Sequence, residues 1–186
     1  GNLYDNLKTS SNKKLIDVCP DFSICENYND FISQLDIFSK KYNIFCVKLC
    51  NSHGSRGFNI VVNDYSEKYF IEHKNSSYTN IDLIKHKFSF YKNFPKVVLS
   101  EFMPGEEYSV DCVRYNSQTL IVPRVRQKIR SGICVQGKIT YKKELIEITK
   151  TIMESFDLIH NINIQFRYDN NYKPKEYVLS SDETHT

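Results

Sequence analysis

The chain has 186 residues, of which 40% are apolar and 25% are charged, and its 25 basic and 22 acidic residues give a net charge of +3. These values are typical of a globular chain and exclude a disordered, collagen-like or coiled-coil protein. Only six glycines are present, and alanine and tryptophan do not occur. Each glycine is therefore expected where no side chain would fit.

Acidic and basic residues are interspersed, so no field of one sign is expected and nucleic acid is not the expected partner. A basic RNA-binding domain is accordingly disfavoured. No apolar run approaches the roughly 20 residues that span a membrane, and no signal peptide is recognisable. We therefore expect a cytoplasmic protein without a membrane partner. Because the sequence starts at Gly1 without a methionine, we expect a longer natural chain with additional domains.

The cysteines lie in strand-like apolar runs and lack the spacing of a short-loop disulfide framework. They are Cys19, Cys25, Cys46, Cys50, Cys112 and Cys134. We expect them to be reduced and buried. A structural zinc is disfavoured because no second pair of ligands with zinc-like spacing accompanies Cys46 and Cys50.

Hydrophobic periodicity predicts a helix and two strands in the first half of the chain. Apolar residues at helical spacing indicate an amphipathic helix over 29–40, and aromatic and β-branched residues indicate strands at 42–48 and 58–62. A polar, glycine-containing loop, 51–57, joins the two strands. Two further segments give no clear prediction: the polar residues 1–20, and residues 67–92, whose second half carries a helical stripe.

In the second half of the chain, hydrophobic periodicity predicts mainly strands. The expected elements are a strand at 97–102, a turn at 103–105, a hairpin of 107–114 with 119–126, a helix over 142–158 and a final hairpin of 162–168 with 175–179. The apolar face of that helix is expected to hold Leu145, Ile148, Ile152 and Ile159. This mixture of helices and hairpins predicts an α+β fold.

Three segments carry residues that suit a phosphate-bearing ligand. Lys48 ends a strand before Gly54, Ser55, Arg56 and Gly57, whose backbone N–H groups and polar side chains can surround phosphate oxygens. A simple turn between strands is the alternative interpretation of that loop.

A second segment, residues 101–111, has carboxylates on both sides of a Pro-Gly turn, where a planar base can hydrogen-bond its edge. An ordinary acidic turn is the alternative. In the third segment, alternation sends Asn161, Asn163, Gln165 and Arg167 to one sheet face. That face suits a polar ligand or a metal-phosphate site, and equally a solvent-facing sheet. Arg124, Arg126 and Arg130 add positive charge suited to an anion.

In this order the segments resemble the ATP-grasp family, most closely the branch of the carbamoyl-phosphate synthase large subunit and the carboxylate-amine ligases. The stretches that carry the resemblance are VKLCNSHGSRGF (47–58), LSEFMPGEEYSVDC (99–112), PRVRQKIRSG (123–132) and NINIQFRYD (161–169). The resemblance implies two α+β lobes with the nucleotide site between them, ATP and Mg²⁺ as cofactors, and activation of a carboxylate as an acyl phosphate that an amine captures. It also implies three parts: an opening segment, 1–41; a small lid lobe, 42–102; and a second lobe, 103–186, with an altered or truncated end.

The resemblance also implies roles for individual residues. Lys48 corresponds to the lysine on the phosphates, and Gly54, Ser55, Arg56 and Gly57 to the phosphate lid. Glu101, Phe102 and Met103 correspond to the hinge on the adenine, Glu107 to the carboxylate on the ribose, and Gln165 to the side chain at the metal. Arg124 and Arg126 are the candidate catalytic residues.

One departure from the family pattern concerns the metal. The pattern ends in Glu-x-Asn-Pro-Arg, whereas this chain has Val178-Leu179-Ser180-Ser181-Asp182 at the best-matching register. Valine cannot bind a hard cation and serine is a poor substitute for a carboxylate, although Asp182 or Glu183 can compensate by a shifted register. We therefore predict an ATP-binding ATP-grasp domain acting on an unidentified small carboxylate or amine. The alternative is a noncatalytic structural or interaction module with the same fold.

Overall fold

The structure is a computed structural model that describes residues 9–50, 57–64, 77–116, 118–130 and 133–181. The chain forms two compact units. One, here called the inserted unit, is Asp21–Phe102, and the other, the host unit, combines Gly1–Pro20 with Met103–Thr186. The expected opening segment, 1–41, is thus divided between the two units after Pro20.

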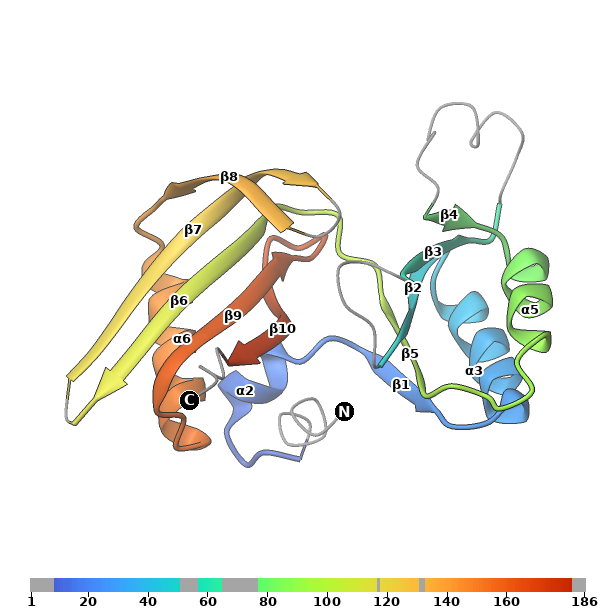
Figure 1. Ribbon diagram of the computed structural model, residues 1–186, viewed down its shortest axis with the longest axis horizontal. Coiled ribbons are helices and arrows are strands. Elements are labelled where there is room, and N and C mark those ends of the chain that lie inside the picture. The colour runs from blue at the N-terminus through green and yellow to red at the C-terminus, as the bar shows by residue number, and fades with distance from the viewer. Residues whose placement is uncertain (1–8, 51–56, 65–76, 117, 131–132, 182–186) are drawn as a thin grey trace. The chain divides into compact units, whose positions relative to one another are not determined.

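The inserted unit is a five-stranded sheet in the order β1-β5-β2-β3-β4, with two helices packed against it (Figure 1). All its strand pairs are antiparallel except β3 with β4. Its elements are β1 (Phe22–Cys25), α3 (Tyr28–Lys41), β2 (Ile44–Leu49), β3 (Asn59–Val62), β4 (Tyr78–Thr79), α5 (Ile81–Ser89) and β5 (Val97–Glu101).

Local sequence explains where α3 starts and which way it faces. The Asn27 side chain caps the helix by accepting a hydrogen bond from the Asp30 amide at 2.9 Å, which satisfies one of the N–H groups left open at a helix start. Phe31, Leu35 and Phe38 recur at a spacing of three or four residues and are all buried. The amphipathic helix expected at 29–40 is therefore confirmed.

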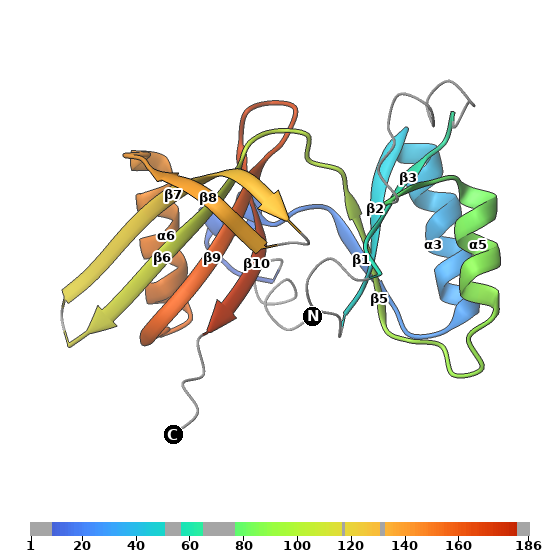
Figure 2. The same cartoon turned by 45° about the horizontal axis from the view of Figure 1, so that its top comes forward.

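The host unit is an antiparallel sheet in the order β10-β9-β6-β7-β8, with α6 against β6 and β7 and the short α2 against α6 and β10 (Figure 2). Its elements are α2 (Lys13–Val18), β6 (Glu107–Tyr115), β7 (Gln118–Arg130), β8 (Ile133–Ile139), α6 (Lys143–Ser155), β9 (His160–Tyr168) and β10 (Pro174–Ser181). Among the helices that the structure describes, none combines the length and apolar character needed to cross a bilayer. Both units are α+β, as predicted.

The expected helix over 142–158 is shorter than predicted. It ends at Ser155, so Ile159 lies outside it and is 53% exposed. Thr149 and Met153 complete the buried face instead of Ile159. Four other elements, α2, β1, β4 and β8, were not expected. The first three are short, and the residues of β8 are mostly exposed on the outer edge of the sheet. Pairing along a long hairpin, rather than burial, produces β8.

Candidate functional site

One face of the host sheet carries a continuous group of polar side chains, here called the polar face. It comprises Glu107, Ser109, Asp111, Arg124, Arg126, Asn163 and Gln165. Strand pleating places it opposite the apolar residues that alternate with it, including Tyr108, Val110, Ile164 and Phe166, which are all buried. The alternation predicted for 161–167 is thus confirmed.

Arginine 126 joins two neighbouring strands at one end of the polar face. It donates hydrogen bonds from Nη1 to the Glu107 carboxylate on β6 and to Gln165 Oε1 on β9, the latter at 3.0 Å. The side chains of Arg126 and Glu107 are only 5% and 12% exposed. Because both charges are nearly buried, separating the two side chains would leave an uncompensated charge in the protein interior. This free-energy cost keeps the pair together.

Arginine 124 forms a second and more accessible pair in the middle of the polar face. Its Nε and Nη2 donate to Asp111 Oδ2 and Oδ1 at 2.5 and 3.0 Å, which is the two-point geometry that guanidinium and carboxylate favour. This hydrogen bonding raises the pKa of Arg124. The two side chains are 35% and 47% exposed, so a ligand in solvent can reach them.

Amide and hydroxyl groups tie the second pair to β9. The Asn163 Nδ2 donates to Asp111 Oδ1 at 2.7 Å and to Ser109 Oγ at 2.8 Å. The ladder explains this contact, because Ser109 pairs with Gln165 and Asp111 with Asn163. The Asp111 carboxylate is therefore held by both the Arg124 guanidinium on β7 and the Asn163 amide on β9.

The register of β10 decides which residues lie across from Gln165 and Asn163. Val178 pairs with Gln165 and Ser180 with Asn163, after a shift of register between Glu176 and Val178. These are the positions at which the family resemblance implies a metal-binding glutamate and asparagine. The backbone register therefore puts a valine where a metal ligand was expected.

The described residues of the polar face do not fit a Mg²⁺ ion. Mg²⁺ needs several oxygen ligands, of which carboxylates are the usual protein contribution. Glu107 and Asp111 each accept from a guanidinium, and Gln165 Oε1 also accepts from Arg126. Within the described part of the chain, no three His, Cys, Asp or Glu residues form a metal-binding group. The expectation that Gln165 approaches a metal stays a prediction.

The expected hinge lies where β5 leaves the inserted unit. The Glu101 carboxylate accepts from the Asp21 amide at 3.1 Å, and the Glu101 amide donates to the Asp21 carbonyl at 3.0 Å. Glu101 therefore fixes the start of β1 to the end of β5. Met103 is buried and Phe102 is half-buried. Whether the three residues hold an adenine stays a prediction.

Gly105 follows the hinge and cannot carry a side chain without a backbone shift. A Cβ there would lie 2.7 Å from both the Cβ and the carbonyl oxygen of Tyr168. The Gly105 amide donates to that same carbonyl at 2.9 Å. The close approach explains why glycine is retained at this position.

The predicted phosphate lid lies mostly outside the described residues, which include neither Gly54, Ser55 nor Arg56. Gly57 is described and has φ +73°, a conformation that favours glycine. Lys48 is half-buried near the end of β2, where it pairs with Val98 in the ladder. The phosphate-binding role of these residues stays a prediction.

Asp111 was not assigned a role from the sequence, nor was Ser109. The hairpin of β6 and β7 contained the signal, because its register pairs Ser109 with Arg124 and Asp111 with Val122, two residue pairs apart along the ladder. Without that register, the partner of each arginine was not predictable. Arg130 is exposed at the end of β7 and does not belong to the polar face.

All six cysteines belong to the described part of the chain, where they are thiols rather than disulfides, and three of them are buried. Burial raises the pKa of Cys25 and of Cys112 to about 12. The partly exposed ones are Cys19, Cys50 and Cys134, which corrects the expectation that all six are buried. Cys19 and Cys50 follow directly after α2 and β2, and Cys134 lies on the edge strand β8, so the core encloses these thiols less completely.

Comparison with known proteins gives a family match for part of the chain and a fold for nearly all of it. Residues 93–175 match the family described as ATP-grasp in the biosynthetic pathway with Ter operon. No curated protein matches the chain significantly by sequence. Among solved structures, the ADP complex of N5-carboxyaminoimidazole synthetase from Staphylococcus aureus is similar with a TM-score of 0.66 at 16% identity, covering 98% of this chain and 45% of that one.

Two further solved structures are similar to this chain in fold. The ADP complex of purK, an N5-carboxyaminoimidazole ribonucleotide synthetase, has a TM-score of 0.61 at 12% identity, over 96% of this chain and 42% of that one. D-alanyl-alanine synthetase A from Vibrio cholerae O1 biovar eltor str. N16961 has a TM-score of 0.60 at 13% identity, over 96% and 52%. The chain thus spans about half the length of these structures. The family match therefore covers residues 93–175, and nearly the whole chain shares the fold of these solved structures.

Proposed function

We propose that the chain binds an adenine nucleotide through its polar face, with Lys48 and the 54–57 loop on the phosphates and Glu101, Phe102 and Met103 on the base. The observation that carries this proposal is the gathering of two guanidinium groups, two carboxylates and two amides on one sheet face. Such an array suits a ligand that combines hydroxyl groups with anionic oxygens. The ADP complexes among the similar structures support the same ligand class.

The reaction that we propose for the bound nucleotide is ATP-dependent ligation of a small carboxylate to an amine. In that reaction the terminal phosphoryl group moves to the carboxylate, and the amine then displaces phosphate from the acyl phosphate. Positioning and charge neutralisation are the main demands of phosphoryl transfer, and Arg124 and Arg126 are the residues we assign to them. Because the chain spans half of its structural relatives, this activity is a proposal for a longer protein.

A noncatalytic nucleotide-binding module is the second candidate. One observation favours it: Val178 and Ser180 occupy the ladder positions opposite Gln165 and Asn163. This candidate predicts nucleotide binding without formation of ADP. Incubation with ATP and a panel of small carboxylates and amines, followed by measurement of ADP, separates the two.

Isothermal titration with ATP and MgCl₂ tests the binding itself. We expect measurable heat with the unmodified chain and at least about tenfold weaker binding for Lys48→Ala, because a charge-assisted contact to phosphate is lost. Lys40→Ala is the matched control, since Lys40 is an exposed helix residue that pairs with Asp36 at 2.7 Å. No heat at millimolar nucleotide, together with no difference between the two variants, would contradict the proposal.

A further inference from the structure

The oxygen atoms of the polar face are already engaged by positive side chains. Asp111 accepts from Arg124 through both carboxylate oxygens, while Glu107 and Gln165 both accept from Arg126. A divalent cation placed on these oxygens would also stand close to two guanidinium charges, and like charges in a partly buried site repel strongly. The geometry therefore favours an anion over a cation next to these residues.

The neighbouring strand adds no carboxylate at the relevant rungs. In the β9–β10 ladder, Val178 pairs with Gln165 and Ser180 with Asn163. Neither residue type supplies a charged oxygen ligand for a hard cation. At these two ladder positions the residue types of β10 therefore add no carboxylate, while β7 contributes Arg124 and Arg126 to the polar face.

Arg124 is the guanidinium that a ligand can reach. It is 35% exposed, and Asp111 accepts from two of its nitrogen atoms, whereas a guanidinium has five N–H donors. Gly137 on β8 lies beside Arg124, since a Cβ added there would be 3.9 Å from Arg124 Nη1. Phosphate oxygens can therefore approach the remaining N–H donors.

We propose that Arg124 and Arg126 take the place of a divalent cation on the polar face, so that the polyphosphate ligand binds there in its metal-free form. This inference rests on the proposed nucleotide binding. Arg126 is the positioning residue, held between Glu107 and Gln165, and Arg124 contacts the phosphate oxygens. The ligand class is a free nucleoside triphosphate or another metal-free polyphosphate.

Titration of the chain with ATP in excess EDTA and again in excess MgCl₂ tests the proposal directly. We expect an affinity in EDTA that equals or exceeds the affinity in MgCl₂, and competition by inorganic tripolyphosphate in EDTA. Binding that requires MgCl₂ overturns this inference but leaves nucleotide binding intact. Absence of binding in both buffers overturns both proposals.

Two variants of the accessible pair give effects of opposite sign. Asp111→Asn releases Arg124 from its counter-charge, and we expect about three- to tenfold tighter binding of ATP in EDTA. Arg124→Gln removes the guanidinium, and we expect about tenfold weaker binding. If Asp111 instead held a metal, Asp111→Asn would weaken binding in MgCl₂, and that result contradicts the proposal.

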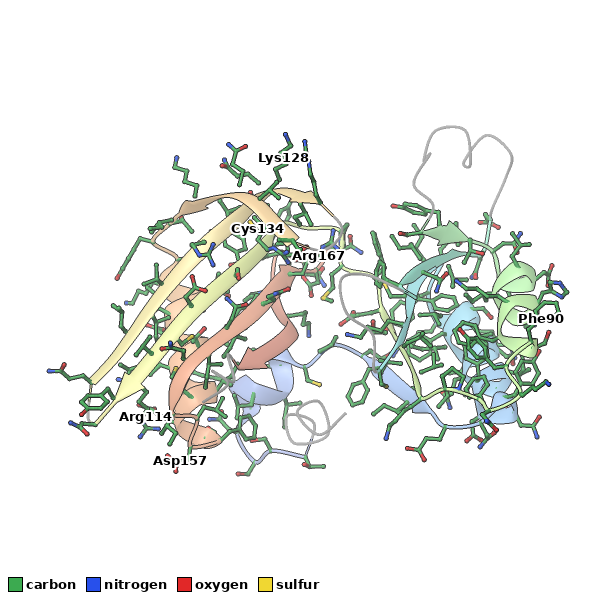
Figure 3. All side chains as sticks on the ribbon, in the orientation of Figure 1. Phe90, Arg114, Lys128, Cys134, Asp157 and Arg167 are labelled. Carbon is green, nitrogen blue, oxygen red and sulfur yellow. The ribbon has the colours of Figure 1, made fainter. Side chains whose placement is uncertain are left out.

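Arg114→Gln is the matched control. Arg114 also lies on β6 and pairs with an aspartate, Asp157, at 3.3 Å (Figure 3). Because side chains alternate along β6, Arg114 belongs to the face opposite Glu107, Ser109 and Asp111. We expect its affinity for ATP to equal that of the unmodified chain in both buffers. An equal loss in Arg114→Gln and Arg124→Gln would show that net charge alone drives binding, which also contradicts the proposal. Circular dichroism of each variant confirms that the comparison is made between folded chains.

Discussion

The two sheets of this chain use their side chains differently. In the inserted unit, all four residues of β3 and the first four of β5 are buried, so both faces of these strands are covered. In the host unit, β9 alternates between buried apolar residues and half-buried polar ones, and one face is left for Arg124, Arg126 and their partners. Fully buried strands provide stability, whereas an alternating sheet can hold a polar site without losing its core.

The core of the inserted unit gives the largest expected effect. Phe31 is fully buried, and its ring lies 4.7 Å from that of Phe88. We expect Phe31→Ala to lower the free energy of unfolding by about 3–5 kcal/mol, because a cavity replaces the ring. Phe90→Ala is the control, since Phe90 is 71% exposed (Figure 3), and a change within about 0.5 kcal/mol is expected. Urea denaturation measures both.

The two ion pairs of the polar face differ in burial, so we expect them to contribute differently to the free energy of unfolding. Glu107→Gln leaves the nearly buried Arg126 without its carboxylate, and we expect a loss of about 3 kcal/mol in unfolding free energy. Asp111→Asn disrupts the exposed pair, and we expect less than about 1 kcal/mol. Equal losses in urea denaturation would contradict the distinction between an interior and an accessible pair.

Glycine replacement tests the close approach after the hinge. In Gly105→Ala the new Cβ meets the backbone of Tyr168, and we expect a loss of about 1–3 kcal/mol by thermal or urea unfolding. Gly137→Ala serves as the comparison, because there the nearest atom, the Val125 carbonyl oxygen, is 3.1 Å away. A smaller loss is expected for Gly137→Ala, and the reverse order would contradict the steric argument.

Alkaline titration gives the smallest effect and compares one tyrosine from each unit. Burial, assisted by hydrogen bonds to Asp21 and Glu106, raises the pKa of Tyr42 and of Tyr108 from 10.0 to about 12. Since the pKa is higher in the folded state, this contribution to stability is complete below pH 10 and is lost as the pH rises towards about 12. Absorbance at the tyrosinate band should show Tyr42 and Tyr108 among the late-titrating phenols, together with Tyr168, whose pKa burial also raises. Tyr42→Phe and Tyr108→Phe should each remove one late-titrating phenol. Titration of both at pH 10 would refute this assignment.

Patterns of local periodicity were sufficient to predict much of the fold and part of the site. The spacing of Phe31, Leu35 and Phe38 predicted α3, and alternation along 161–167 predicted that Asn163 and Gln165 share a face. The pairing of Arg124 with Asp111 was not predictable, because it depends on the register of β6 against β7. Similarly, β8 arises from hairpin extension rather than from burial.

The discontinuity of the host unit has a consequence for the order of folding. All residues of the inserted unit are contiguous and are present once Phe102 has been synthesised. The host unit, in contrast, needs α2 from before that segment and α6 and β10 from after it, and Lys175 on β10 donates to the Asp17 carbonyl of α2 at 2.7 Å. Contacts between such distant segments form slowly, because a long loop must close first. During synthesis, the inserted unit can therefore complete its core before α6 and β10, which contact α2, have been synthesised.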